Sequence, residues 1–134
     1  MAATPFILGS APLGSVELAI DGLRSAKGVV QVCLTTRPDK FPSCDGDPDA
    51  RRASVSAARP ATEFSGLPSG GYALALIHDE NVNHRLDTAL GIPREGFGFS
   101  RNPPIRFGPP RFHSASFAVS GGATQQRVKM KYLL

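Results

Sequence analysis

Short stretches in which apolar and other residues alternate dominate the hydrophobic pattern of the chain. In residues 16–23, the apolar side chains of Val16, Leu18 and Ile20 occupy every second position, which is the period of a half-buried β-strand. Residues 28–36, GVVQVCLTT, are β-branched and apolar, so they predict a second strand. The RSAKG turn between the two strands predicts that they pair as a hairpin.

Further strands are predicted towards the C-terminus. The apolar run from Tyr72 to His78 has small or apolar residues on both faces, which favours a strand covered on both sides. Residues 113–120 and 126–134 predict two closing strands joined by the GGATQ turn, and basic residues alternate with apolar ones in the second. Residues 51–60 have a weak period that fits either a strand or a short helix.

Glycine and proline separate these strands, with 14 Gly and 12 Pro in 134 residues. Residues 37–50 hold three Pro and four Asp, which predicts a long irregular connection. Residues 79–112 lack a sustained period and predict a long loop. Six or seven short strands joined by such turns favour an all-β, two-sheet antiparallel β-sandwich. We expect one domain, 15–134, preceded by a flexible N-terminal segment, 1–14.

Composition and charge narrow the function classes. Apolar residues make up 41% of the chain and charged residues 19%, as in globular proteins. The net charge is +4, but basic residues are rarely interleaved with aromatic ones, which argues against a nucleic-acid-binding surface. Four arginines in the Pro-rich segment are candidates for contact with an anionic partner: Arg94, Arg101, Arg106 and Arg111. The sequence has no apolar stretch long enough to be a transmembrane helix.

Cys33 and Cys44 are the two cysteines of the chain. In an oxidising compartment they would close a short disulfide loop worth about 3 kcal/mol, whereas in the cytosol they would remain thiols. The sequence alone leaves both states open. The first fourteen residues contain no charged side chain and so lack the basic region of a signal peptide. A chain that begins after a removed signal peptide fits this pattern.

Two longer motifs carry a family resemblance. Residues 64–72, FSGLPSGGY, resemble the turn and strand of transthyretin-like and carboxypeptidase-regulatory-like sandwiches. With HDENVNHRLDTALGIPREGFGFSRN at 78–102 and GPPRFHSASFAV at 108–119, nearly the whole chain resembles the bacterial domain of unknown function 2141 (DUF2141). The resemblance implies an exported, periplasmic or secreted β-sandwich with a transthyretin-like or immunoglobulin-like Greek key, and it implies no activity. His84 departs from the family's usual N-x-N-G-x-x-D pattern, because it stands where the glycine would be.

Oxygen-bearing side chains after the apolar strand are spaced as in a calcium loop. The pattern is D-x-N-x-N-x-x-x-D, formed by Asp79, Asn81, Asn83 and Asp87. Such ligands suit Ca²⁺, and Glu95 is a candidate for an additional ligand. Leu90 stands where an EF-hand has its bidentate Glu, so this is not an EF-hand. The alternative is that the Asp and Asn side chains only form hydrogen-bonded turns.

The predicted role is a non-enzymatic binding or structural module of the cell envelope, with an envelope protein or polymer as partner and residues 79–112 as its functional face. The oligomeric state is left open, and no catalytic residue is predicted, because no G-x-S-x-G elbow or phosphate-binding glycine loop is present. One alternative is a hydrolase whose metal is held by Asp79, Asp87 and His78. Another is a carrier of a small apolar ligand beneath the Phe-rich segment 97–107, although packing of these aromatics is the expected arrangement.

Overall fold

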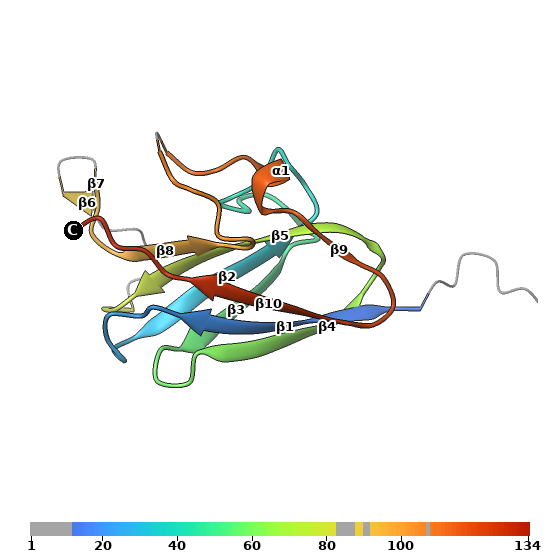
Figure 1. Cartoon of the computed structure of the whole chain (residues 1–134), viewed down its shortest axis with the longest axis horizontal. Helices are drawn as coiled ribbons and strands as arrows, with labels where there is room; N and C mark the ends of the chain where they lie inside the picture. The colour runs from blue at the N-terminus through green and yellow to red at the C-terminus, as the bar shows by residue number, and fades with distance from the viewer. Residues whose placement is uncertain (1–11, 83–87, 90–91, 107) are drawn as a thin grey trace, which may run out of the picture.

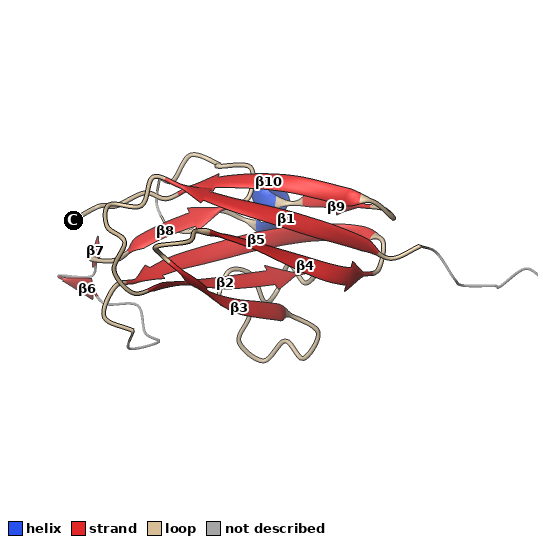
Figure 2. Ribbon diagram, turned by 90° about the horizontal axis from the view of Figure 1, so that it is seen from below, coloured by secondary structure: helices blue, strands red, loops and turns tan. Residues whose placement is uncertain are grey.

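Two β-sheets pack face to face in the computed structural model of the chain (Figures 1 and 2). The structure describes residues 12–82, 88–89, 92–106 and 108–134. This architecture confirms the predicted all-β, two-sheet sandwich. Most of the proposed flexible segment, residues 1–11, lies outside the described residues, and Gly14 already belongs to the first strand.

The strands divide between the sheets in a fixed order. The first sheet has the order β10-β1-β4, formed by Ala123–Lys129, Gly14–Asp21 and Ala61–Leu67. The prediction that the strands pair antiparallel is wrong for β1 and β10, which run parallel. The second sheet has the order β3-β2-β5-β8, formed by Arg51–Ser56, Val29–Thr35, Gly70–Asp79 and Gly96–Phe99. The start of β5 also pairs with β9, Phe117–Val119. The remaining elements are the pair β6, Thr88–Ala89, and β7, Ile92–Pro93, and the short helix α1, Phe112–Ala115. No helix in the described part of the chain is long and apolar enough to span a membrane.

The predicted hairpin of the first two strands is wrong, because β1 and β2 lie in opposite sheets. Their alternating apolar side chains meet across the core instead of side by side in one sheet. These side chains are all buried: Val16, Leu18, Ile20, Val30, Val32 and Leu34. Gly28, at φ +69, ends the connecting turn where an added Cβ would collide with the backbone of Asp79 and Glu80. The alternation therefore predicted which residues are buried but not which strands are neighbours.

The predicted long loop 79–112 is also wrong in part, because it contains strand β8. Its sequence GFGF gives no apolar–polar alternation, and the glycines face the inside of the sandwich. A Cβ on Gly98 would lie 2.7 Å from Cγ1 of Val128, so only glycine lets the C-terminal strand pack this closely. Backbone hydrogen bonds between Phe97 and Lys131, at 2.8 and 3.0 Å, then join the two sheets on this side.

The prediction of two closing strands near the C-terminus also needs correction. Of the strand predicted at 113–120, residues 113–115 belong to α1 and only 117–119 form β9. β9 and β10 do not pair with each other but with β5 and β1. The basic–apolar alternation at the C-terminus is confirmed, because Val128 and Met130 are buried and Lys129 is exposed. In the ambiguous segment 51–60, Arg51–Ser56 forms strand β3.

Two connections cover the outer face of the second sheet, so the prediction that β5 is buried on both sides is confirmed. Phe41 of one connection and Ile105 and Phe112 of the other pack against a second cluster of buried residues. That cluster consists of Ala73, Ala75, Phe97, Phe99 and Ala115. Packing of Phe97 and Phe99 is therefore confirmed, whereas Phe107 lies outside the described residues.

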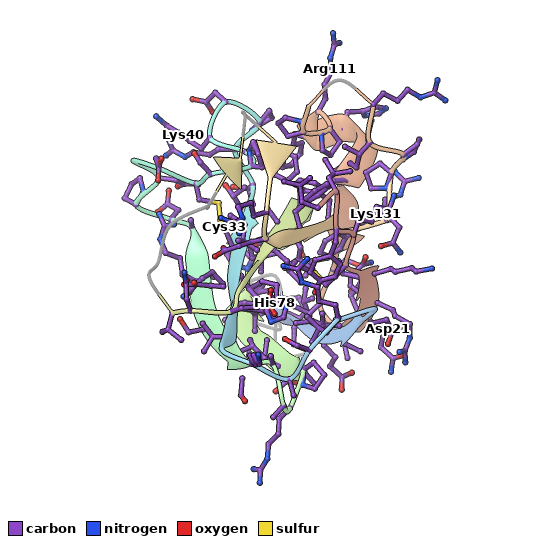
Figure 3. The ribbon with its side chains drawn as sticks, turned by 90° about the vertical axis from the view of Figure 1, so that its left-hand side faces the viewer. Asp21, Cys33, Lys40, His78, Arg111 and Lys131 are labelled. Carbon is purple, nitrogen blue, oxygen red and sulfur yellow. A yellow bond between two sulfur atoms is a disulfide. The ribbon has the colours of Figure 1, made fainter. Side chains whose placement is uncertain are left out.

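A disulfide holds the first of these connections. Cys33 of β2 is bonded to Cys44, and their Cα atoms are 6.5 Å apart (Figure 3). Beside it, the buried carboxylate of Asp47 accepts hydrogen bonds from the Thr35 hydroxyl and from the Asp49 N–H. The Thr35 hydrogen bond holds the pKa of Asp47 below its ordinary value, although burial acts in the opposite direction.

Ser100 links the second connection, between β8 and β9, to β5. Its fully buried hydroxyl accepts a hydrogen bond from the Leu74 N–H at 2.9 Å and donates one to the Ala115 carbonyl. The Ser100 N–H donates to the Leu74 carbonyl at 3.1 Å. Ser100 thus fills the gap along β5 between the end of β8 and the start of β9.

We expect Ser100→Ala to lower the free energy of unfolding by about 1–3 kcal/mol, because a buried N–H and a buried carbonyl would lose their partner. Urea denaturation measures this change. The exposed Ser120 provides the matched control, and Ser120→Ala should alter stability by less than about 0.5 kcal/mol. Equal losses in the two variants would contradict the role given to the Ser100 hydroxyl.

Removal of the disulfide should lower the free energy of unfolding by about 3 kcal/mol. The bond joins residues 11 positions apart and so reduces the conformational entropy of the unfolded chain. Denaturation of the Cys33→Ala, Cys44→Ala variant tests this. Wild type in reductant should approach the same stability, and reductant should leave the double variant unchanged. An unchanged wild-type transition after verified reduction would contradict the prediction.

Candidate functional site

Two of the predicted calcium ligands lie at the same end of the second sheet. Asp79 is the last residue of β5, Glu95 directly precedes β8, and His78 pairs with Gly96 between them. Both carboxylates are buried, with 1% and 4% of their surface exposed. Burial of a carboxylate requires hydrogen bonds or a cation, so this pair marks a polar centre at the base of the 80–94 segment.

The other predicted ligands are not brought together within the described residues. Asn81 is exposed, and Asn83 and Asp87 lie outside the described residues, as does His84. Val82 turns the chain sharply after β5, with φ at +54, and its N–H lies 3.4 Å from the Asp79 carbonyl. In the described ranges, no group of three or more His, Cys, Asp and Glu side chains is placed to hold a metal ion.

His78 has a structural environment that differs from that of Asp79. Successive side chains of a strand point to opposite faces, so His78 points into the sandwich and Asp79 away from it. The fully buried imidazole donates from Nε2 to the Lys27 carbonyl at 2.8 Å, since a carbonyl can only accept (Figure 3). Its Nδ1 is 2.8 Å from the Tyr132 hydroxyl. Both ring nitrogens are engaged, so this geometry does not support His78 as a metal ligand beside Asp79.

Arg24 gathers the chain segments around this end of the sandwich. Its Nε and Nη2 donate to Oε1 of Glu80 at 3.0 and 2.7 Å. The same guanidinium donates to the backbone oxygens of Leu134 and Arg94 at 2.6 and 2.9 Å. It also lies 4.6 Å from the centre of the Tyr132 ring, within the range of a cation–π contact. Glu80, the first residue after β5, is therefore held by Arg24, which also bonds to the C-terminal segment and to the residues before β8.

Hydrogen bonds make Glu80 more acidic. Its Oε2 accepts a 2.7 Å hydrogen bond from the Ser25 hydroxyl, which is the largest influence lowering the pKa of Glu80. The hydrogen bond and charge of Arg24 lower this pKa further, whereas burial raises it.

Sequence reasoning did not predict the partners in this hydrogen-bonded network. The signal was present in the alternation of β5, since His78 follows Tyr72, Leu74 and Leu76 on the inward face. A histidine at the end of an inward-facing row needs partners inside the sandwich. The identity of those partners, Lys27 and Tyr132, depends on folding across 51 and 54 residues.

The hollow beside the aromatic residues is small. The space next to Phe97, Phe99 and Ile105 leaves no room even for a water molecule, whereas small-molecule pockets usually begin at roughly 300 Å³. A larger hollow of about 730 Å³ lies on the first sheet and is open to solvent. Polar side chains contribute much of its lining, including Glu17, Glu63 and Arg127. Neither hollow has the character expected of a closed carrier site for an apolar ligand.

The lowered pKa of Glu80 predicts an acid-dependent stability. An unfolded Glu has a pKa of about 4.3, so Glu80 stabilises the fold fully above that pH and loses this effect as pH falls through its lower folded pKa. Stability measured from pH 6 to pH 2 should therefore decline less steeply below about pH 4.3 in Glu80→Gln than in wild type. Ser25→Ala should give a decline of intermediate steepness, because it removes only one of the interactions that lower the pKa of Glu80. Identical slopes in all three proteins would contradict this assignment.

Comparison with known proteins places the chain in a family. Neither the curated proteins nor the solved structures contain a match to it. A family model described as "Uncharacterized protein conserved in bacteria (DUF2141)" matches residues 18–127, which extend from within β1 to within β10. The chain therefore belongs to the bacterial DUF2141 family.

Proposed function

We propose that this chain is an exported, non-catalytic module of the cell envelope that binds or supports an envelope protein or polymer. We further propose that Ca²⁺ orders its 79–95 segment. The Cys33–Cys44 disulfide supports export to the periplasm or beyond, because such bonds persist in oxidising compartments and are rare in the bacterial cytosol. The Leu67–Gly70 turn, which carries the chain from one sheet to the other, supports a transthyretin-like relationship.

The buried carboxylates of Asp79 and Glu95 carry the calcium proposal. They stand at the two ends of a segment that also contains Asn81, Asn83 and Asp87. Together these five side chains offer carboxylate and amide oxygens, and Ca²⁺ completes shells of six to eight oxygens with backbone carbonyls and water. Arg24 bonds to Glu80 and to the Arg94 carbonyl, which are next to Asp79 and Glu95 in the sequence, so both ends of the segment are held in place.

Calcium should raise the melting temperature of the protein, because a ligand that binds only the folded state stabilises it. At a concentration ten times the dissociation constant the gain is about 1.4 kcal/mol, which corresponds to a shift of several degrees. Differential scanning calorimetry in 10 mM Ca²⁺, in 10 mM Mg²⁺ and in chelator measures the effect. No shift in Ca²⁺ relative to chelator would reject the calcium site and favour a loop ordered by Asx hydrogen bonds alone.

The Asp79→Asn, Glu95→Gln double variant should lose the calcium-dependent part of the shift, whatever its melting temperature in chelator. Glu63→Gln removes a carboxylate that lies on the first sheet and should retain the shift. Elemental analysis of the purified protein distinguishes the calcium-ordered module from the alternative, a metal-dependent hydrolase. A stoichiometric transition metal, lost from the double variant, would favour a metal-dependent hydrolase over the calcium-ordered module.

A further inference from the structure

Charge is distributed very unequally along the chain. Residues 96–134 contain six Arg and Lys and neither Asp nor Glu, whereas residues 1–95 contain nine basic and eleven acidic side chains. The C-terminal part therefore carries a formal charge of +6 and the rest −2. Figure 2 shows β8, β9, β10 and α1 in the upper half of the sandwich together with β1, and β2, β3 and β4 in the lower half. The positively charged C-terminal part of the sequence therefore lies on one side of the sandwich.

Five cations on this side lack an ion pair with any carboxylate in the described part of the chain, and we call them the basic face. They are Arg101, Arg106, Arg111, Lys129 and Lys131. The nearby Arg127 is not included, because it binds both carboxylate oxygens of Asp21 at 3.0 Å. The first four members are exposed and Lys131 is half-buried, so their charge is directed towards solvent instead of being neutralised within the fold.

Side-chain hydrogen bonds bring the loop and strand parts of the basic face together. Asn102 donates from its amide nitrogen to the Arg127 carbonyl at 3.1 Å and accepts from the Lys129 N–H at 2.8 Å. Lys131 lies against the same segment, with its Nζ 3.4 Å from the Pro103 carbonyl. The start of the arginine-bearing loop therefore lies along the edge of β10.

The rest of the arginine-bearing loop is anchored by apolar side chains that pack on the second sheet. Ile105 and Phe112 pack into the aromatic cluster on the second sheet, next to Arg106 and Arg111 in the sequence. Figure 3 shows Arg111 extending away from the body of the protein. Apolar side chains thus fix the loop while its arginines remain available, so little ordering of the backbone would be needed on binding.

We infer that the basic face docks the protein on a membrane surface rich in anionic, phosphate-bearing lipid headgroups. Arginine binds phosphate oxygens in pairs, and clustered cations accumulate at anionic bilayers. Leu133 and Leu134, two and three residues after Lys131 in the sequence, are more than half exposed and offer apolar groups for the lipid interface. No Phe or Tyr side chain among the described residues is exposed for stacking on nucleic-acid bases. The inference deepens the proposed envelope role and is independent of the calcium site.

Co-sedimentation of the full chain with phospholipid vesicles in chelator tests this inference. Wild type should bind vesicles containing phosphatidylglycerol, release them as salt is raised, and ignore pure phosphatidylcholine vesicles. The Arg101→Gln, Arg106→Gln, Arg111→Gln variant should bind the anionic vesicles about 100-fold less, since each cation near the surface contributes several-fold to partitioning. The Leu133→Ser, Leu134→Ser variant should also bind less.

The matched control is Lys27→Gln, Lys40→Gln, Arg59→Gln, which lowers the net charge equally outside the basic face. This control should keep most of the wild-type vesicle binding, and melting curves should show both triple variants folded. Equal losses in the two triple variants, or no wild-type binding at physiological salt, would overturn the inference. Binding to dextran sulfate or duplex DNA without binding to vesicles would also overturn it. Because chelator is present, a failed calcium-dependent melting shift would leave this result unaffected.

Discussion

The burial of β5 on both faces is the constraint on which the rest of the structure depends. Its inward residues, including Leu74 and Leu76, meet the first sheet, while Ala73 and Ala75 leave an outer face that a single sandwich cannot cover. Two irregular connections supply that cover. Because irregular backbone packs poorly by itself, each connection is secured by a covalent or polar link, the disulfide in one case and the Ser100 hydroxyl in the other. The turn-rich composition follows from this arrangement.

Local periodicity predicted the buried side chains well and their spatial neighbours poorly. The alternation around Leu18 and Val32 correctly identified inward residues, because the pleat of a strand sets the direction of each side chain. It could not assign the strands to sheets, since either pairing would bury the same residues. β8 was missed because Gly96 and Gly98 replace the expected apolar positions, and the reason for those glycines lies in the C-terminal segment that packs on them.

The candidate site shows the same division between local and distant information. Spacing singled out Asp79, and Glu95 was proposed as an additional ligand; both are buried at one end of the sheet. The partners of His78 were beyond local reasoning, because Lys27 and Tyr132 meet it only after three distant segments converge. Of the other predicted ligands, Asn81 is exposed, and Asn83 and Asp87 belong to residues that the structure does not describe.

The Asn102 amide has a consequence for the solubility of the fold. By pairing with the Arg127 carbonyl and the Lys129 N–H, it occupies backbone groups that the outermost strand would otherwise offer to another chain. On the opposite border of the same sheet, the Arg51 guanidinium donates to the Ser65 carbonyl and occupies one acceptor there. Side chains thus take the place of a neighbouring strand at both margins. This protection disfavours edge-to-edge aggregation of the sheets, while the faces of the sandwich remain accessible to a partner.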